Sequence, residues 1–508
     1  MSSFPLLSIL IALPVVGAIV VLLAPRKANV ARGIALGFGT LGLILAGLLW
    51  HSYDAAAGTL QFVERAAWIP SLAIEYHLAV DGFSLLLLVL SALVTLISIV
   101  ASTQVKSRPS LYFALVLLLE AGLFGTFTAL NFFHWFLFWE LSLIPAFFLI
   151  RLWGGPKREA AATQFFVYTM VGSVTLLLSF LALYLATGTF DFSALAQMAQ
   201  QGMLLPAIAA HFSGNSSSWL LLIFWGSFLG FAVKIPIIPF HTWLPEAYTE
   251  APTAITILLT GALSKMGVYG LLRIVLPIFS EQIRWMQPLL LWLAVLTIVS
   301  AAAAAFAQRD LKRILAYSSI NHLGYCVLAI FAVAGSTKPI ESSAALSGAA
   351  LQLFNHGVTA SLLFWLVALL EQRSGGKRSI NDFGGLRATV PAFAAIFGIA
   401  AFSSLGLPGL NGFIGEFLIF KGSFALATWP SSIAVLGLFI TAVLYLTVVQ
   451  KVFTGPTQER WNGMADLSGR ERIWIAPLVL LMFVLGIFPQ LVLGLVNGSV
   501  SLLVGQIR

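Results

Sequence analysis

The chain is a succession of apolar runs, each about twenty residues long, separated by short polar connections. The runs Pro5 to Leu23 and Trp219 to Val233 lack the apolar–polar alternation typical of barrel strands. Backbone N–H and C=O groups inside a bilayer must be satisfied within the protein, so runs of this length predict transmembrane helices. The pattern predicts about fourteen of them, at 5–25, 33–52, 80–103, 110–130, 131–153, 163–186, 218–239, 252–280, 287–306, 314–334, 343–371, 389–424, 430–453 and 473–496.

Basic residues gather in every second loop of this arrangement. The alternate loops hold only Arg65, Arg284, Lys338 and Lys421. Because lysine and arginine concentrate on the cytoplasmic side of membrane proteins, this bias predicts an even number of helices and both termini away from the cytoplasmic or stromal side. The loops rich in basic residues hold Arg26, Lys27, Arg32, Lys106, Arg108, Arg151, Lys157, Arg158, Arg309, Lys312, Arg313, Arg373, Lys377, Arg378, Arg387, Lys451, Arg460, Arg470 and Arg472.

Composition supports a membrane protein that carries no cofactor of its own. Of 508 residues, 59% are hydrophobic and only 9% are charged, whereas a soluble protein has roughly a quarter charged. The net charge of +8 does not indicate nucleic-acid binding, because the basic residues are scattered between apolar runs. The single cysteine, Cys326, excludes an internal disulfide, a cysteine-ligated iron–sulfur cluster and a C-x-x-C-H haem site. Glycine-rich nucleotide motifs and metal-ligand spacings are also missing.

Two predicted spans are interrupted in their interiors. The seventh contains Lys234-Ile-Pro236-Ile-Ile-Pro239, and the twelfth contains Leu407-Pro-Gly-Leu-Asn-Gly412. Proline removes a backbone donor and ends the helix locally, and interrupted helices in matching positions typically mark an inverted repeat around a mid-membrane ion site. Two unrelated kinks are the alternative. The expected organisation is helices 1–3 in 1–109, a first inverted repeat of helices 4–8 in 110–280, a second of helices 9–13 in 281–453, and a loop with helix 14 in 454–508.

Several ionisable residues fall inside predicted spans, where a charge costs about 2.5–3.5 kcal/mol even on the lenient insertion scale. Glu140 has about ten apolar residues on either side, close to half of a helix that spans a bilayer. Lys234 at the first interruption and Lys265 in mid-span supply positive charges that can pair with it. A glutamate–lysine pair whose separation varies would change its affinity for protons. The alternative is a fixed salt bridge that locks two helices together.

Two histidines and a second glutamate extend this set. His322 and His356 lie on successive spans, each directly after an asparagine, and histidine titrates near neutral pH. Glu416 follows the second interruption and is the expected exit carboxylate; the alternative is an interfacial residue near Lys421. The sequence therefore predicts a proton path along Glu140, Lys234, Lys265, His322, His356 and Glu416.

Three further polar features accompany this predicted path. Glu120 lies in mid-span without an evident partner. Arg273 is near a helix end, from which its guanidinium is expected to snorkel to the interface. The polar connection 240–252 lacks lysine and arginine and is interpreted as a loop at the mouth of the path.

Five motifs jointly resemble the signatures of the antiporter-like subunits of complex I. They are Ala232 to Thr253, Leu263 to Gly270, Arg309 to Ser319, Asn355-His356-Gly357 and Leu407 to Glu416, and the resemblance runs from about residue 80 to 460. Phe138-Trp-Glu140-Leu, and a glutamate at 416 where related subunits carry lysine, resemble the bacterial M type, or chain 4 (the D subunit) of the cyanobacterial and plastid NAD(P)H–quinone oxidoreductase.

The resemblance implies an all-α polytopic membrane fold of fourteen helices with two inverted five-helix repeats, each containing a broken helix. It implies a proton-translocating subunit of an NAD(P)H– or ferredoxin–quinone oxidoreductase, in which quinone reduction elsewhere drives proton transfer. Glu140 would pair with Lys234, and protons would pass Lys265, His322 and His356 and leave by Glu416.

The resemblance also implies where cofactors and partners lie. NAD(P)H or ferredoxin, FMN, iron–sulfur clusters and quinone belong to partner subunits, and the neighbours are other antiporter-like subunits in a bacterial inner membrane or a thylakoid membrane. The family often has aspartate where Asn131 stands, which bears on the entry path. The alternative is a cation/proton antiporter subunit of the multi-subunit sodium–proton type, which shares most of these motifs.

Overall fold

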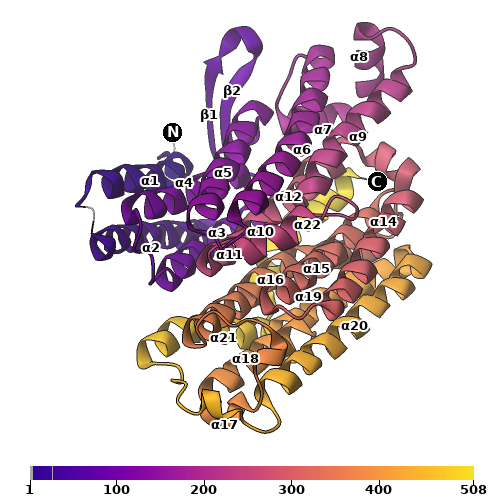
Figure 1. Ribbon diagram of the computed structural model, residues 1–508. Helices are drawn as coiled ribbons and strands as arrows, with labels where there is room; N and C mark the ends of the chain where they lie inside the picture. Colours follow the sequence, from indigo (N-terminus) through magenta and orange to yellow (C-terminus); the bar gives the residue numbers. More distant parts are fainter. Residues whose placement is uncertain (1–3, 26, 508) are drawn as a thin grey trace.

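The computed structural model describes residues 4–25 and 27–507, so Arg26, which entered the orientation argument, lies outside them. The molecule is a bundle of long helices with one small hairpin (Figure 1). The first half of the chain comprises α1 (Leu6–Leu23), α2 (Ala28–Ser52), β1 (Gln61–Ile69), η1 (Pro70–Leu72), β2 (Ile74–Val80), α3 (Gly82–Ala101), α4 (Pro109–Thr128), α5 (Phe132–Trp153), α6 (Arg158–Thr187), α7 (Phe192–Gln200), α8 (Leu204–His211), α9 (Ser216–Lys234) and α10 (Trp243–Glu250). The remainder comprises α11 (Thr253–Leu258), η2 (Leu259–Leu263), α12 (Lys265–Gly270), η3 (Leu271–Val275), α13 (Leu276–Ile278), α14 (Ser280–Ala307), α15 (Leu311–Val333), α16 (Pro339–Arg373), η4 (Ile380–Asp382), α17 (Leu386–Thr389), α18 (Pro391–Ser404), α19 (Asn411–Leu426), α20 (Thr428–Phe453), η5 (Glu459–Trp461), α21 (Gly469–Ile487) and α22 (Gln490–Gln506).

By length and apolar composition, 12 helices of the described chain can cross a membrane, or 13 if the bent pair α21–α22 is one span. Two of the fourteen predicted spans, 389–424 and 473–496, are not among these 12 helices. The first of them is not one continuous helix. It is divided into α18 and α19, of 14 and 16 residues, each short for a full crossing. The predicted span 473–496 continues into α22 through a bend of 64°.

The expectation of a purely helical fold is wrong between α2 and α3, where β1 and β2 form an antiparallel hairpin. The hairpin is tied to the bundle through His77, whose carbonyl accepts from Leu130 N and whose Nδ1 lies 2.6 Å from Asp191 Oδ2. Burial raises the pKa of the Asp191 carboxyl, but hydrogen bonds from His77 and the Ala194 N–H outweigh it and hold the pKa below its ordinary value. The hairpin, the connection before α5 and the connection before α7 are therefore joined at this end of the bundle.

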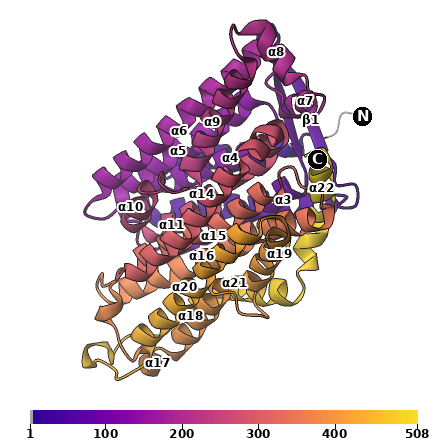
Figure 2. The same cartoon turned by 90° about the vertical axis from the view of Figure 1, so that its right-hand side faces the viewer.

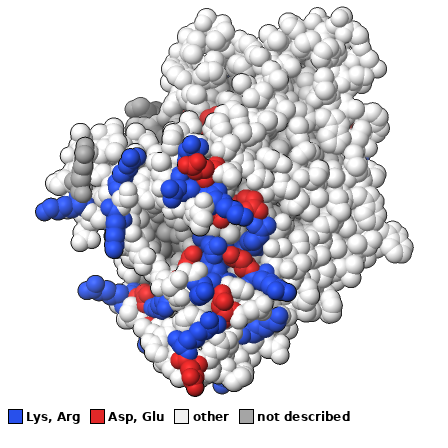
Figure 3. All heavy atoms as spheres, in the orientation of Figure 1, with Lys and Arg blue, Asp and Glu red and all other residues white. Residues whose placement is uncertain are grey.

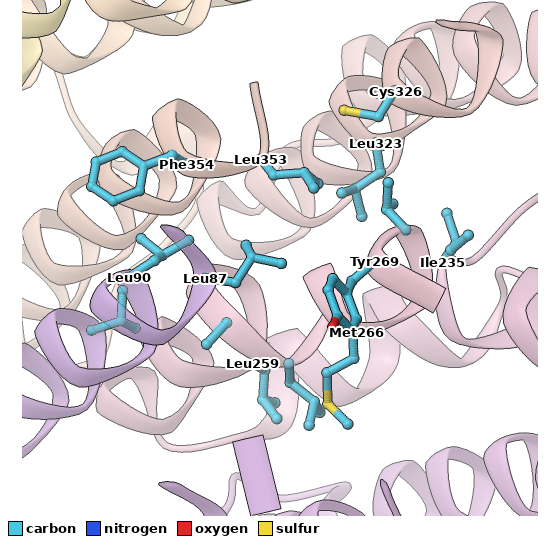
Figure 4. Packing of buried hydrophobic residues seen from close by; sticks show 14 of the residues in the cluster. Leu87, Leu90, Ile235, Leu259, Met266, Tyr269, Leu323, Cys326, Leu353 and Phe354 are labelled. Atoms are coloured by element: carbon cyan, nitrogen blue, oxygen red, sulfur yellow. The ribbon is translucent and has the colours of Figure 1, made fainter. Parts of the chain in front are cut away.

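Burial is uneven among the helices. The helices α11–α13, α15 and α16 have 94–100% of their apolar windows buried inside the protein, against 28% for α2 and 33% for α20. Figure 4 shows how closely the interior packs, with Leu87 of α3, Met266 of α12 and Leu353 of α16 in one apolar cluster. The helices that carry Lys265, His322 and His356 are therefore shielded from lipid by the rest of the bundle.

The first predicted interruption is present. The helix α9 ends at Lys234, and residues 240–252, predicted to be a loop, contain the helix α10. Pro236 has no N–H to continue the helix, and the freed Val233 carbonyl instead accepts from the Trp243 indole at 2.9 Å. The Ile238 N–H donates to Thr297 Oγ1 at 3.0 Å, so a neighbouring helix satisfies the unwound segment.

The second predicted interruption separates α18 from α19. Gly406 has φ +77° in the turn after Ser404, and a Cβ there would also lie 2.8 Å from Glu416 Oε2. Gly412 begins the next helix so close to α18 that a Cβ would lie 1.9 Å from the Ser403 carbonyl oxygen. The glycines therefore allow the two half-helices to approach and the Glu416 side chain to lie against the turn.

The two ends of the bundle differ in charge. The chain termini, β1, α7 and α22 lie at one end and α10 and α17 at the other (Figure 2). On the face seen in Figure 3, charged side chains gather toward the lower left and are almost missing over α6–α9. This distribution agrees with the asymmetry of basic loops.

Gly412→Ala should destabilise the protein by about 1–3 kcal/mol, because the added Cβ meets backbone that cannot yield. The measurement is thermal unfolding of the purified protein in detergent. Gly398→Ala in α18 is the control, since a Cβ there meets nothing within 4 Å. Equal unfolding temperatures for the two variants would show that this close approach is unimportant.

Candidate functional site

Glu140 and Lys234 lie on adjacent parts of α5 and α9 but are not in direct contact. Glu140 is half-buried, and its Oε1 has no hydrogen-bond partner among the described residues. The Lys234 Nζ lies 4.9 Å from the ring centroid of Trp139, a cation–π distance. No Glu140–Lys234 ion pair within 4.0 Å occurs in residues 4–25 and 27–507. The ring of Trp139, the residue directly before Glu140, therefore lies beside the Lys234 ammonium.

Lys265 begins a short α-helix, α12, that lies between two π-helical segments, η2 and η3. Segments of this kind are rare and are common at functional sites. The Lys265 ammonium donates to the Thr260 carbonyl within η2, to Ser264 Oγ at 3.3 Å and to His356 Nδ1 at 2.7 Å. The side chain is fully buried, so these three acceptors replace its water shell.

The contact between Lys265 and His356 can hold a proton on either side. With the lysine charged, His356 Nδ1 is the acceptor and the ring is neutral; with the lysine neutral, the same nitrogen can donate. His356 also lies beside His322, with ring centroids 5.3 Å apart. The two histidines therefore continue the path from α12 into the second half of the chain.

His322 is bound at the second interruption. Its Nδ1 lies 2.7 Å from the Ser318 carbonyl oxygen, and its Nε2 lies 3.0 Å from the carbonyl oxygen of Ser404, where α18 ends. Carbonyl oxygens only accept, so this geometry fits a ring protonated on both nitrogens. Glu416 Oε1 lies 3.4 Å from Nε2, and Gln352 donates to the same oxygen at 3.1 Å.

Four of the six predicted site residues thus form one connected series: Lys265, His356, His322 and Glu416. Lys234 connects to it through helix packing, since a Cβ at Gly267 would lie 3.3 Å from the Lys234 Cβ. Sequence reasoning missed Gln352, although it precedes His356 by one helical turn on the same face. It also missed the carbonyl oxygens of Thr260 and Ser404, for which the sequence carries no signal.

Glu120, Asn131 and Arg273 do not belong to this connected series. Both carboxyl oxygens of Glu120 are buried without a hydrogen-bond partner in the described part of the chain. Asn131 is the N-cap of α5 and accepts from Phe133 N, a role that asparagine and aspartate fill equally well. The Arg273 guanidinium, expected to snorkel to the interface, instead donates to Asp81 Oδ2 at 2.8 Å.

Residues 129–442 match the family described as NADH:quinone oxidoreductase/Mrp antiporter, transmembrane. The NADH-quinone oxidoreductase subunit M of Rickettsia conorii is 36% identical over 99% of both chains. The chain belongs to this family. NAD(P)H-quinone oxidoreductase chain 4 3 of Trichormus variabilis is 34% identical, over 96% of this chain and 89% of that protein.

Two solved structures contain chains that share this fold. A chain of respiratory complex I from Thermus thermophilus superposes with a TM-score of 0.83 at 29% identity, covering 98% of this chain and all of that chain. A chain of the Mrp complex from Dietzia sp. superposes with a TM-score of 0.85 at 20% identity, over 100% of both chains, and shows the shared fold alone.

His356→Ala should lower stability by about 1–3 kcal/mol, because the buried Lys265 ammonium loses an acceptor. His356→Asn, which keeps an acceptor, should recover part of that loss. The measurement is a double-mutant cycle with Lys265→Met, followed by thermal unfolding, and His51→Ala on the exposed end of α2 is the control. A coupling energy near zero would contradict the contact.

Proposed function

We propose that this chain is the M-type, proton-translocating membrane subunit of an NAD(P)H– or ferredoxin–quinone oxidoreductase. The observation that carries the proposal is the connected series Lys265, His356, His322 and Glu416, which runs through the most deeply buried helices to the second interruption. A charge is tolerated there only with partners, and each member has the next as a partner. Such a series can move a proton by small displacements of neighbouring groups.

The first half of the path begins at Glu140 and Lys234. The ammonium now lies over Trp139, at the end of α9, where the helix is interrupted. Movement of Lys234 toward Glu140 would stabilise its charge and draw protons to that pair, whereas movement away would favour release toward Lys265. Trp139 is therefore the side chain that must yield when the pair closes.

The two interruptions support an arrangement as two inverted five-helix repeats, 110–280 and 281–453. One interruption falls in each segment, and a proposed site residue lies at each, Lys234 in the first and Glu416 in the second. The asymmetry of basic loops supports termini away from the cytoplasmic or stromal side, in a bacterial inner membrane or a thylakoid membrane.

The energy for pumping is proposed to come from partner subunits. These would hold FMN, iron–sulfur clusters and quinone and would oxidise NAD(P)H or ferredoxin, while this chain contributes only titratable side chains. Neighbouring antiporter-like subunits in the bilayer are the expected direct contacts.

The alternative is a subunit of a multi-subunit sodium–proton antiporter. The Mrp likeness supports it at the level of fold, but the relatives at 34–37% identity are named as quinone oxidoreductase subunits. Purification of the intact complex discriminates the two: a quinone-reducing assembly favours the first function, and an assembly without redox centres favours the second.

Glu140→Gln or Lys234→Met should lower the protons pumped per quinone reduced by about tenfold or more, because one partner of the switch can no longer carry its charge. The measurement is proton uptake and quinone reduction by the complex in proteoliposomes. Glu159→Gln, exposed in the first turn of α6, is the matched control. Undiminished pumping in both site variants would refute the path.

A further inference from the structure

A large cavity of mixed polar and apolar lining lies outside the proposed path. It has a volume of about 570 Å³ and is lined from α3, α7, α12, η3, α13, α22 and the segment after α2. Two of these elements, α7 and α22, lie at the end of the bundle that holds both termini (Figure 2). The cavity therefore opens on the opposite end from α10 and from most of the basic loops.

The lining includes a buried ion pair that is not part of the proposed path. Arg273 in η3 donates to Asp81 Oδ2 at 2.8 Å, and the other Asp81 oxygen accepts from Ser84 N at the start of α3. An ion pair buried among apolar helices is costly unless water or further hydrogen bonds reach it. Asp81 and Arg273 both line the cavity, so the pair borders open space.

Tyr269 also lines the cavity, and it connects the cavity to α12. Its hydroxyl lies 3.0 Å from Ser84 Oγ and donates to the Phe127 carbonyl oxygen at 3.1 Å, and the residue is only 1% exposed. Lys265 lies four residues earlier on the same helix, one turn away. The Cβ atoms of residues at this spacing are about 5–6 Å apart. Tyr269 thus lines the cavity from the helical turn that follows the one carrying Lys265.

The Lys265 side chain now points the other way, toward Thr260 and His356. Lysine has a long, flexible stem, and α12 lies between two π-helical segments whose hydrogen bonding differs from that of an α-helix. A change of its rotamer would move the ammonium away from His356.

We propose that the cavity is a second aqueous access to Lys265, from the end that holds the termini, with Tyr269 as its gate and Asp81–Arg273 at its wall. The ligand is water carrying protons. A proton passes from the Lys265 ammonium to the Tyr269 oxygen while the phenol proton passes to cavity water, directly or through the Ser84 hydroxyl, which gives up its own proton in turn. Lys265 and Tyr269 both end neutral, and no redox step is involved. Lys265 then has two outlets, one through His356 and one through Tyr269. The inference rests on the proposed function.

Cysteine accessibility tests the cavity without any measurement of pumping. In a Cys326→Ser background, Ala196→Cys on the cavity wall and Tyr269→Cys at its floor are introduced into the complex in sealed vesicles. A charged, membrane-impermeant thiol reagent added at the terminus side should modify both about tenfold faster than Tyr248→Cys, a buried tyrosine position within α10. Labelling at Ala196→Cys but not at Tyr269→Cys would overturn the proposal.

The variant Tyr269→Phe tests whether the Tyr269 hydroxyl is the gate. It also keeps the proposal testable if Tyr269→Cys fails to fold. It should lower the protons pumped per quinone reduced by about tenfold while quinone reduction continues, whereas Tyr248→Phe should not. If Tyr269→Phe pumps normally while Glu140→Gln impairs pumping, the second access through Tyr269 is overturned and the proposed path stands. Unchanged pumping in Glu140→Gln with labelling at Tyr269→Cys would instead refute the proposed path and leave the cavity in place.

Discussion

Hydrogen bonding of the backbone inside the bilayer is the constraint on which this structure depends. Every helix interruption frees carbonyl oxygens inside the bilayer, and these need hydrogen-bond donors from the surrounding protein or from water in a cavity. The donors are the residues of interest: Lys265 binds the Thr260 carbonyl, His322 binds that of Ser404, and the Trp243 indole binds that of Val233. The irregular backbone and the buried polar side chains therefore stabilise each other, and neither would persist alone.

This mutual dependence determines where charges are tolerated. The helices that carry Lys265, His322 and His356 are surrounded by the rest of the bundle, so their polar groups meet protein and not hydrocarbon. Glu416 can lie against the second interruption because glycine at 406 leaves room for its carboxylate. A proton path through such a bundle follows the places where helices are broken.

The sequence predicted most of the helices and both interruptions, because hydrophobic length and proline positions are local signals. It also predicted Lys265, His322, His356 and Glu416, which the structure brings together, while their roles stay predictions. It missed the hairpin β1–β2, whose residues 61–80 carry no long apolar run. It missed the π-helical segments around Lys265 and the Asp81–Arg273 pair, since both depend on how distant helices meet.

The uneven burial of the helices has a consequence for how the chain enters the membrane during synthesis. The segment Thr253–Ile278 carries Lys265 and Arg273, has a mean hydropathy of only 1.5 and is 100% buried, whereas Leu6–Leu23 reaches 3.0. Each central lysine or arginine adds about 2.5–3.5 kcal/mol to the cost of insertion as a single helix. Such a segment inserts poorly by itself. Its retention in the bilayer therefore depends on contacts with helices that were inserted earlier. The insertion of this segment is thus coupled to the insertion of its neighbours.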